Sequence, residues 1–384
     1  MIRVLELVPG LSMGGAEAIV KEYCMELDKN KFEIYVLCLT RYNLPYEKLL
    51  ADNGVKVFYL SDYLWFKNSK NFFVKCVHFI QQKLFKYFLM RYFIRKINPN
   101  VIHTHMGLNM CVRFARPKKP VAIFHTVHSE PKKLWNTNKE DFRATKWLLK
   151  KYDLKIITLH DDMRNEVNHM FGISNCAVLN NGIDFSRFEQ KIDRDSYRKE
   201  LGIPENAFVV GHVGRFAIPK NHEFLVDVFK EIVSQTDNAF LLLVGDGELK
   251  EQTIQKLESY NLLEKTLILS NRTDIPYLMQ CMDVLVFPSR WEGLSITLIE
   301  AQKTGLKCVV SDRVNRATTI SNLVITKSID KDSPKEWASA ALTLKVLNVE
   351  YNAIEDWNMK NVVRKLENMY IEEYNSKSKS GVEK

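Results

Sequence analysis

The sequence predicts an α/β protein with two doubly wound parallel sheets, each flanked by helices. Three observations support this class. Short apolar runs alternate with longer amphipathic runs along nearly the whole chain, as expected for repeated βαβ units. The 384 residues exceed one ordinary domain of ~150 residues. A charged stretch without sheet-like runs, at about residues 185–206, divides the alternation into two series.

The candidate strands are short runs rich in branched and aromatic residues. In the first series they lie at residues 3–8, 33–39, 55–60, 101–105, 121–125 and 155–159. In the second series they lie at residues 208–213, 239–244, 266–269, 284–287 and 307–310. Helical periodicity predicts helices between them, for example at 17–27, 141–151, 222–234, 249–260 and 295–304, and a short helix at 194–201 in the charged stretch.

This organisation predicts an N-terminal domain at residues 1–186, a C-terminal domain at residues 187–360 and a disordered tail at residues 377–384. Doubly wound sheets bind ligands beyond the carboxyl ends of their strands. We therefore expect a ligand cleft between the two domains. The architecture alone does not identify a reaction.

Composition narrows the class of protein. Hydrophobic residues make up 46% of the chain and charged residues 26%, which is typical of a soluble globular protein. Glu6 and Pro9 interrupt the first apolar run too early for a signal peptide, and no stretch approaches the ~20 apolar residues of a membrane span. The seven cysteines are scattered without a C-x-x-C pair, which favours reduced thiols in the cytoplasm.

Much of the net charge of +9 is concentrated in one segment. Residues 66–96 contain eight Lys or Arg, nine Phe or Tyr, and no Asp or Glu. Such a segment can lie on an anionic membrane surface, or it can be a helix whose aromatic face joins the core. We favour the membrane, because the segment has more aromatic surface than one buried stripe needs. We expect no nucleic-acid partner, since no single-strand stacking module is present.

The strongest motif lies at residues 287–301, where a buried strand ends in a turn that opens a helix near Ser295. Unpaired N–H groups at a helix start bind phosphate well, and Gly293 lets the backbone approach a ligand. Glu292 and Glu300 stand eight residues apart. Each carboxylate can accept neighbouring hydroxyls of a ribose or a hexose. The alternative is an ordinary helix capped by Ser295, with Glu300 in solvent.

A second strand, at residues 208–213, runs into a turn at Gly214 and delivers Arg215 and Lys220 near the expected cleft. Two fixed cations can stabilise the negative charge that develops on a departing diphosphate. The alternative is a pair of surface cations near a helix start, where positive charge is mildly unfavourable.

Two further glycine turns follow strands. Gly14 and Gly15 would allow close backbone approach to a ligand, but the turn lacks the G-x-G-x-x-G spacing and disfavours a nicotinamide cofactor. Gly245 lies in a turn after the strand at 239–244. That turn can place its backbone beside a nucleotide, or it can be a tight turn with no role in binding.

Histidines cluster at two strand ends, as His103, His105, His125 and His128. A metal site is conceivable, but no third conventional ligand stands at a telling spacing, so we expect no metal. We expect His128 to donate or accept a hydrogen bond with a sugar hydroxyl, and the other three to be structural.

With these motifs the chain resembles family four of the retaining glycosyltransferases, which have the GT-B architecture, over nearly its whole length. It is most similar to bacterial exopolysaccharide and capsule transferases, judging by Gly14-Gly15-Ala16-Glu17 and Glu292-Gly293-Leu294. The E-x7-E motif of the family is matched by Glu292 and Glu300, its R-x4-K pair by Arg215 and Lys220, and its N-G-[VI]-D link by Asn181-Gly182-Ile183-Asp184.

The resemblance implies a role for each matched residue. Glu300 should bind the ribose hydroxyls, Glu292 the donor sugar, and Arg215 and Lys220 the diphosphate. Backbone at Gly15 and at Leu294, Ser295 and Ile296 should help to hold the diphosphate, the base should lie near Arg272, and His128 should lie near the transferred sugar. The last helix, at about 361–376, should pack on the first domain.

The resemblance also implies the reaction: transfer of a hexose or N-acetylhexosamine, with retention, from a nucleotide sugar. By family habit the donor is a UDP-sugar and the acceptor a lipid-linked saccharide, at the inner face of the cell membrane. No D-x-D pair stands where a metal-dependent transferase would use one, so we expect the two cations to replace a metal. One departure, Arg313-Val314-Asn315-Arg316 where relatives often show Thr-Lys-Glu, leaves donor and acceptor details open. A nucleotide-sugar epimerase and a non-catalytic nucleotide-sugar-binding partner remain as alternatives.

Overall fold

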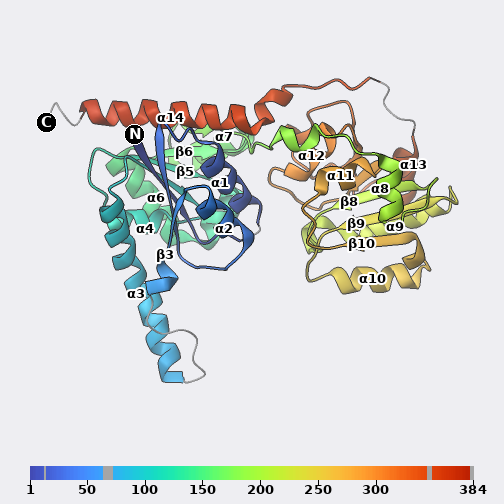
Figure 1. Ribbon diagram of the computed structural model, residues 1–384, viewed down its shortest axis with the longest axis horizontal. Coiled ribbons are helices and arrows are strands. Elements are labelled where there is room, and N and C mark those ends of the chain that lie inside the picture. The colour runs from blue at the N-terminus through green and yellow to red at the C-terminus, as the bar shows by residue number, and fades with distance from the viewer. Residues whose placement is uncertain (13, 64–71, 344–347, 381–384) are drawn as a thin grey trace. The chain divides into compact units, whose positions relative to one another are not determined.

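The computed structural model describes residues 1–12, 14–63, 72–343 and 348–380, with the backbone alone for residues 72–84 and 380. The chain forms two compact units, one made of residues 1–182 and the helix from residue 359 onward, the other of residues 183–358. The unit boundary thus lies close to the domain boundary expected after residue 186. Each unit is a parallel sheet with helices on its faces (Figure 1).

The sheet of the first unit has seven parallel strands in the order β3-β2-β1-β4-β5-β6-β7. The strands are β1 (Ile2–Val8), β2 (Phe32–Cys38), β3 (Lys56–Tyr59), β4 (Val101–His105), β5 (Ala122–Thr126), β6 (Lys155–Thr158) and β7 (Ala177–Val178). The strand order reverses between β1 and β4. Ligands of such sheets bind beyond the carboxyl ends of the strands at this reversal.

The helices of the first unit are α1 (Gly15–Glu26), α2 (Pro45–Asp52), α3 (Phe72–Ile97), α4 (Asn109–Ala115), α5 (Pro131–Thr137), α6 (Lys139–Tyr152), α7 (Asp161–Phe171) and α14 (Met359–Ser380). The last helix, α14, packs against α1 and β5 of this unit, as the resemblance implied (Figure 1).

The expected disordered tail is wrong for its first residues, because α14 continues to Ser380. Lys377 secures this final turn. Its Nζ lies 2.9 Å from a carboxylate oxygen of Asp153 and 3.0 Å from one of Glu373, one helical turn earlier. Residues 381–384 lie outside the described part of the chain.

Helix α3 carries the aromatic and basic segment and has two different faces. Met90, Phe93, Ile94 and Ile97 are buried in the core. On the other side the rings of Phe85, Phe88 and Tyr92 are 51%, 60% and 54% exposed. In the described part of α3, one face therefore joins the core, and the other exposes aromatic rings at the surface. Residues 66–71 of the segment, and the side chains of residues 72–84, lie outside it.

The sheet of the second unit has six parallel strands in the order β10-β9-β8-β11-β12-β13, which reverses between β8 and β11. The strands are β8 (Phe208–Val213), β9 (Ala239–Val244), β10 (Thr266–Leu269), β11 (Val284–Phe287), β12 (Lys307–Ser311) and β13 (Val324–Lys327). The helices are α8 (Arg194–Glu200), α9 (His222–Val233), α10 (Lys250–Ser259), α11 (Ile275–Gln280), α12 (Ile296–Lys303) and α13 (Pro334–Leu342). The two-domain, Rossmann-like fold class is confirmed.

Candidate functional site

In the second unit, two predicted residues meet beyond the strands where the order reverses. Lys220 ends the short 3-10 helix after β8, and Glu292 lies in the turn between β11 and α12. The Nζ of Lys220 is 2.6 Å from Oε1 of Glu292, and the two side chains are only 17% and 13% exposed. The same Nζ lies 4.6 Å from the centre of the Phe287 ring. A largely desolvated cation and carboxylate are thus held together at the place where this fold binds ligands.

Gly214 makes room for the lysine. A Cβ at this position would lie 3.2 Å from Cδ and from Cε of Lys220, which is tighter than ordinary contact. The two loops are also joined by their backbones, since the N–H of Arg290 donates to the carbonyl of Pro219 at 2.7 Å. The structure therefore gives Gly214 a role in placing Lys220.

Arg215 does not join this pair. Its guanidinium lies 2.9 Å from the carboxylate of Glu248, and the two side chains are 72% and 54% exposed. A surface ion pair of this kind contributes little to stability and exchanges readily. Of the two predicted cations, the structure brings only Lys220 to Glu292.

Glu300 lies in α12 and is partly buried. Its carboxylate makes no hydrogen bond or ion pair within the described residues. Burial raises its pKa to about 7, and the charge of Arg187 opposes the rise. An unpartnered, half-desolvated carboxylate near strand ends is the type of group that a ligand hydroxyl can satisfy.

The start of α12 is not capped by its serine. Ser295 occupies the N-cap position, but its side chain makes no capping hydrogen bond, and its buried Oγ has no partner in the described part of the chain. Leu294 is buried, Ile296 is partly buried and Gly293 is exposed beside them. The plain capped-helix alternative is therefore wrong for Ser295, and the N–H groups of this turn stay available to an anion.

Gly245 and Arg272 were predicted to lie beside the nucleotide, but both make close contacts within the protein itself. Gly245 has φ +156°, and a Cβ there would collide with the carbonyl of Gly214. The close approach of the β8 and β9 loops thus explains this glycine without a ligand. Arg272, after β10, binds Asp274 with Nε 2.7 Å from Oδ1, and also donates to the hydroxyl of Tyr197.

In the first unit, the glycines after β1 open helix α1. Gly14 is the N-cap and Gly15 the first helical residue. A Cβ added at Gly15 would meet nothing within 4 Å. No contact inside the described chain therefore demands glycine at this position, which leaves a close ligand as a reason for it.

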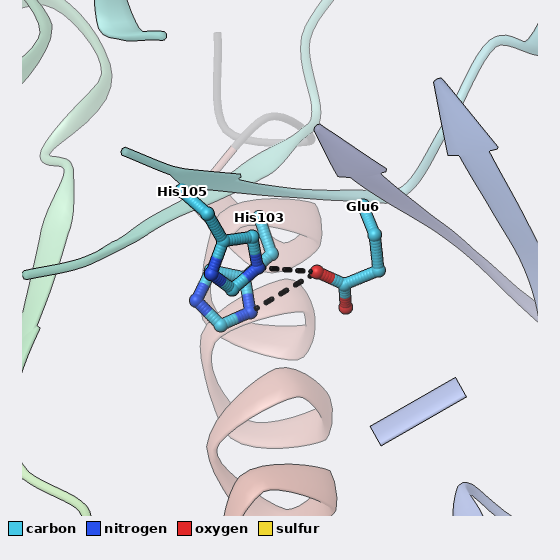
Figure 2. A group of neighbouring side chains, drawn as sticks. All are labelled: Glu6, His103 and His105. Carbon is cyan, nitrogen blue, oxygen red and sulfur yellow. Dashed lines mark hydrogen bonds and ion pairs between the residues drawn. The ribbon is translucent and has the colours of Figure 1, made fainter. Parts of the chain in front are cut away.

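The histidines beside β1 form a buried cluster around a residue that the sequence analysis did not select. Glu6 stands opposite His103 in the pairing of β1 with β4, and its carboxylate points to the rings of His103 and His105 (Figure 2). Its Oε2 lies 2.8 Å from Nε2 of His105 and 3.5 Å from Nδ1 of His103. All three side chains are fully buried. The one available signal was an acid among the apolar residues Val4, Leu5, Leu7 and Val8 of this strand.

The cluster has the dimensions of a metal site, because ligand atoms of Glu6, His103 and His105 lie within 4.8 Å of one another. It is nevertheless satisfied by hydrogen bonds. The two nitrogens of His103 lie 2.6 Å from the hydroxyl of Tyr370 and 2.7 Å from that of Thr126. We therefore assign it as a hydrogen-bonded network, and the absence of a metal requirement stays a prediction.

His128 extends this network to the edge of the sheet. Its Nε2 lies 2.8 Å from Nδ1 of His105. Its ring is partly exposed, but its Nδ1 is buried and has no partner in the described residues. Burial, reinforced by neighbouring histidines, holds the pKa of His128 well below its usual value. An unpaired buried acceptor costs about 1–3 kcal/mol, so His128 is poised for a donor.

Two further histidines lie near Lys220 and were missed. The Nδ1 of His212 lies 2.9 Å from the carbonyl of Val286, whereas both nitrogens of His222 are buried without a partner in the described chain. Together these groups provide a cation, carboxylates, an uncapped helix start and unpaired imidazole nitrogens. They suit an anionic ligand rich in hydroxyls.

Comparison with known proteins supports this chemistry. Residues 13–187 match the family described as "Glycosyltransferase Family 4", and residues 193–353 match "Glycosyl transferases group 1". The putative glycosyltransferase EpsF of Bacillus subtilis is 27% identical over 88% of this chain and 86% of its own. An Escherichia coli enzyme, UDP-Gal:alpha-D-GlcNAc-diphosphoundecaprenol alpha-1,3-galactosyltransferase, is 26% identical over 96% of both chains.

Solved structures share the fold. The structure of Anabaena HepE in complex with UDP covers both chains fully, with a TM-score of 0.71 and 16% sequence identity. The structure of WaaG, a glycosyltransferase involved in lipopolysaccharide biosynthesis, covers 94% of both chains with a TM-score of 0.66 and 13% identity.

Proposed function

We propose a donor, an acceptor and a mechanism for this chain, which belongs to the family 4 and group 1 glycosyltransferases of bacterial polysaccharide biosynthesis. The proposed reaction moves a hexose or N-acetylhexosamine from a UDP-sugar to a lipid-linked saccharide, with retention at the anomeric carbon. The observation that carries the proposal is the Lys220–Glu292 pair at the strand reversal, with the unpartnered carboxylate of Glu300 nearby in α12.

The choice of donor and acceptor follows the relatives. The E. coli relative is named for UDP-galactose and for an acceptor on diphosphoundecaprenol. We propose that Glu300 accepts the ribose hydroxyls, Glu292 contacts the donor sugar, and the free N–H groups at the start of α12 hold the diphosphate. The side chain of Arg215 is exposed and, among the residues that the structure describes, is paired with the exposed carboxylate of Glu248, so a diphosphate can compete for it.

We propose that Lys220 and Arg215 stabilise the negative charge of the departing diphosphate, as a metal ion does in other transferases. The bond between the anomeric carbon and the diphosphate oxygen breaks, and the cations stabilise the charge on the departing oxygen. The acceptor hydroxyl attacks from the same face and forms the new carbon–oxygen bond. Its proton passes to the departing phosphate oxygen, so no enzyme carboxylate needs to act as a nucleophile.

We further propose that the chain works at the inner membrane surface through α3. The exposed Phe85, Phe88 and Tyr92 can enter the interface, where aromatic rings bind well. A surface hollow of about 380 Å³ adjoins this face, and its lining suits the phosphates of anionic lipids: Arg91, Met110, Arg113, Phe114, Arg116 and Trp147. The part of the chain that the structure describes contains no candidate membrane-spanning helix.

The test is a thermal-shift screen of the full chain against a panel of nucleotide sugars. A ligand of the folded state stabilises it by ~2.7 kcal/mol at a hundredfold excess over Kd. The best ligand is then incubated with a lipid-linked saccharide, and the anomeric configuration of the product is read by NMR. Product formed without acceptor would instead identify an epimerase. Binding without product for any acceptor tried would favour a non-catalytic partner.

A further inference from the structure

We infer that Glu6, acting through His105, fixes His128 as a hydrogen-bond acceptor for a substrate hydroxyl. Glu6 and His105 are then positioning residues, and His128 is the group that touches the ligand. The inference rests on the proposed function only for the identity of that ligand, a hydroxyl of a nucleotide sugar.

The path is a line of three side chains on neighbouring strands. Glu6 lies in β1, His105 ends β4, and His128 lies just after β5. The Oε2 of Glu6 is 2.8 Å from Nε2 of His105, and Nδ1 of His105 is 2.8 Å from Nε2 of His128 (Figure 2 shows the first contact). The rings of His105 and His128 lie 5.1 Å apart between centroids. The line begins in the core and ends at a partly exposed ring.

The chemistry of the first residue sets the direction of every later bond. A carboxylate only accepts hydrogen bonds, so Nε2 of His105 must carry a proton and donate it. The Nδ1 of a neutral His105 is then a lone pair, which must accept from Nε2–H of His128. A neutral His128 with its proton on Nε2 has a bare lone pair on Nδ1. This is the buried atom without a partner in the described chain.

The charge states needed for this assignment are supported independently. Burial alone would raise the pKa of Glu6, but the charge of His103 and hydrogen bonds from His103 and His105 outweigh it and hold the pKa at about 2. Burial lowers the pKa of His105 to about 4, although Glu6 opposes the fall. Glu6 is therefore ionised and His105 neutral near pH 7.

A second branch leaves the same carboxylate and provides a control. The hydroxyl of Tyr370, in α14, donates to Oε1 of Glu6 at 3.0 Å. The Nδ1 of His103 lies 2.6 Å from that hydroxyl, and its Nε2 lies 2.7 Å from the hydroxyl of Thr126. Removing Tyr370 alters this branch and leaves the Glu6–His105–His128 line intact.

The first test is NMR of the imidazole nitrogens in the full chain at neutral pH, with signals assigned through the His105→Gln and His128→Asn variants. We expect both rings to be neutral, with protons on Nε2 and bare lone pairs on Nδ1. Saturation with the best nucleotide sugar from the thermal-shift screen should shift the Nδ1 resonance of His128. A His128 ring protonated on Nδ1, or on both nitrogens, would overturn the inference. So would a stoichiometric bound metal in the purified protein.

The second test compares Glu6→Leu with Tyr370→Phe, which remove adjacent polar groups of one network. Without the carboxylate, the proton of His105 should move to Nδ1, and that of His128 should move to Nδ1 in turn. Tyr370→Phe should keep both protons on Nε2. Should Glu6→Leu fail to fold, the spectrum of the unaltered chain still decides the inference.

Kinetic measurements with a panel of monodeoxy nucleotide sugars test whether the His128 ring contacts a substrate hydroxyl. In the unaltered chain, loss of one particular hydroxyl should lower kcat/KM roughly tenfold or more, since a site built for a hydroxyl discriminates strongly against its absence. In Glu6→Leu that same deoxy sugar should be used as well as its parent, whereas Tyr370→Phe should still discriminate. Equal discrimination in both variants would reject Glu6 as the positioning residue. Expected spectra without transfer of any sugar would reject the proposed function alone.

Discussion

Lys220 and Glu292 form a 2.6 Å ion pair across 72 residues of sequence, between the loops that follow β8 and β11. The pair is largely desolvated, so each charge is compensated by the other. A ligand with both phosphate and hydroxyl groups can satisfy the two separately. The pair thus provides a preformed place for a sugar diphosphate, and neither charge has to be buried alone before the ligand arrives.

Lys220→Ala should lower kcat by roughly 10²–10³-fold with little change in donor affinity, because the lysine is proposed to act on charge that develops in the transition state. Steady-state kinetics and calorimetric titration with the donor give the two quantities. Lys256→Ala is the matched control. Its Nζ lies 2.7 Å from Asp227 and its side chain is 21% exposed, so it removes a similar ion pair away from Glu292. A comparable loss of turnover in the control would assign the effect to stability.

Glu300→Gln should remove a pH dependence of folding stability. Burial raises the pKa of this carboxyl from 4.5 to about 7, so between these values the folded chain keeps a proton that the unfolded chain has released. Stability from this group therefore falls as pH rises from about 4.5 to 7, by at most ~3 kcal/mol and by less for a partly exposed side chain. Urea unfolding at several pH values measures this. An unchanged pH profile in the variant would contradict the assignment.

The same carboxyl predicts the pH dependence of donor binding. Only the ionised form accepts both ribose hydroxyls, so the affinity for UDP should rise as pH increases through about 7. The diphosphate itself also titrates, and Glu300→Gln isolates that contribution. Glu300→Ala should weaken donor binding by roughly 10–100-fold while turnover changes less. If Glu300→Gln and the unaltered chain bind UDP with the same pH dependence, Glu300 does not bind the ribose.

The sheets could be predicted from sequence because their strands are apolar runs bounded by turns. The predicted strands at 101–105, 208–213, 239–244, 266–269 and 284–287 match β4, β8, β9, β10 and β11. The edge strands β7 and β13 were missed. Ala177–Val178 is only two residues long, and none of the residues Val324–Lys327 is fully buried, so neither strand leaves a strong apolar pattern.

Sequence reasoning predicted only part of the site, namely the residues whose positions follow from the order of the strands. Lys220 and Glu292 each follow a strand that borders the reversal, so the topology brings them together. Arg215 is exposed and its rotamer follows the nearest carboxylate, which no sequence pattern encodes. Glu6 was missed because its partners lie 97 and 99 residues away, and only the β1–β4 register brings them into contact.

Replacing Phe85, Phe88 and Tyr92 with Ser should release the chain from anionic vesicles, because their exposed rings supply the apolar part of the proposed surface. Co-sedimentation with vesicles containing phosphatidylglycerol measures binding. Tyr42→Ser with Leu49→Ser is the control, since these side chains are 48% and 40% exposed away from α3. Retained binding in the triple variant, or equal loss in the control, would remove α3 from the membrane proposal.

Gly15→Ala and Gly245→Ala should separate a ligand-facing glycine from a structural one. A Cβ at Gly15 meets nothing within 4 Å, so the first variant should fold with unchanged or slightly higher stability, as Ala is the better helix former. If the backbone there approaches the donor diphosphate, its donor affinity should nevertheless fall, by about tenfold for one lost backbone contact to a charged group.

Gly245→Ala should behave in the opposite way. Its φ of +156° is strained for alanine, and the new Cβ would meet the carbonyl of Gly214, so the loops after β8 and β9 must separate. We expect a loss of more than ~1 kcal/mol in the free energy of unfolding, and weaker donor binding only as a consequence. Thermal unfolding and donor titration of the two variants measure both effects. Gly214 also borders Lys220, so a separation of the loops after β8 and β9 should disturb the lysine. A stable Gly245→Ala protein with full turnover would contradict this expectation.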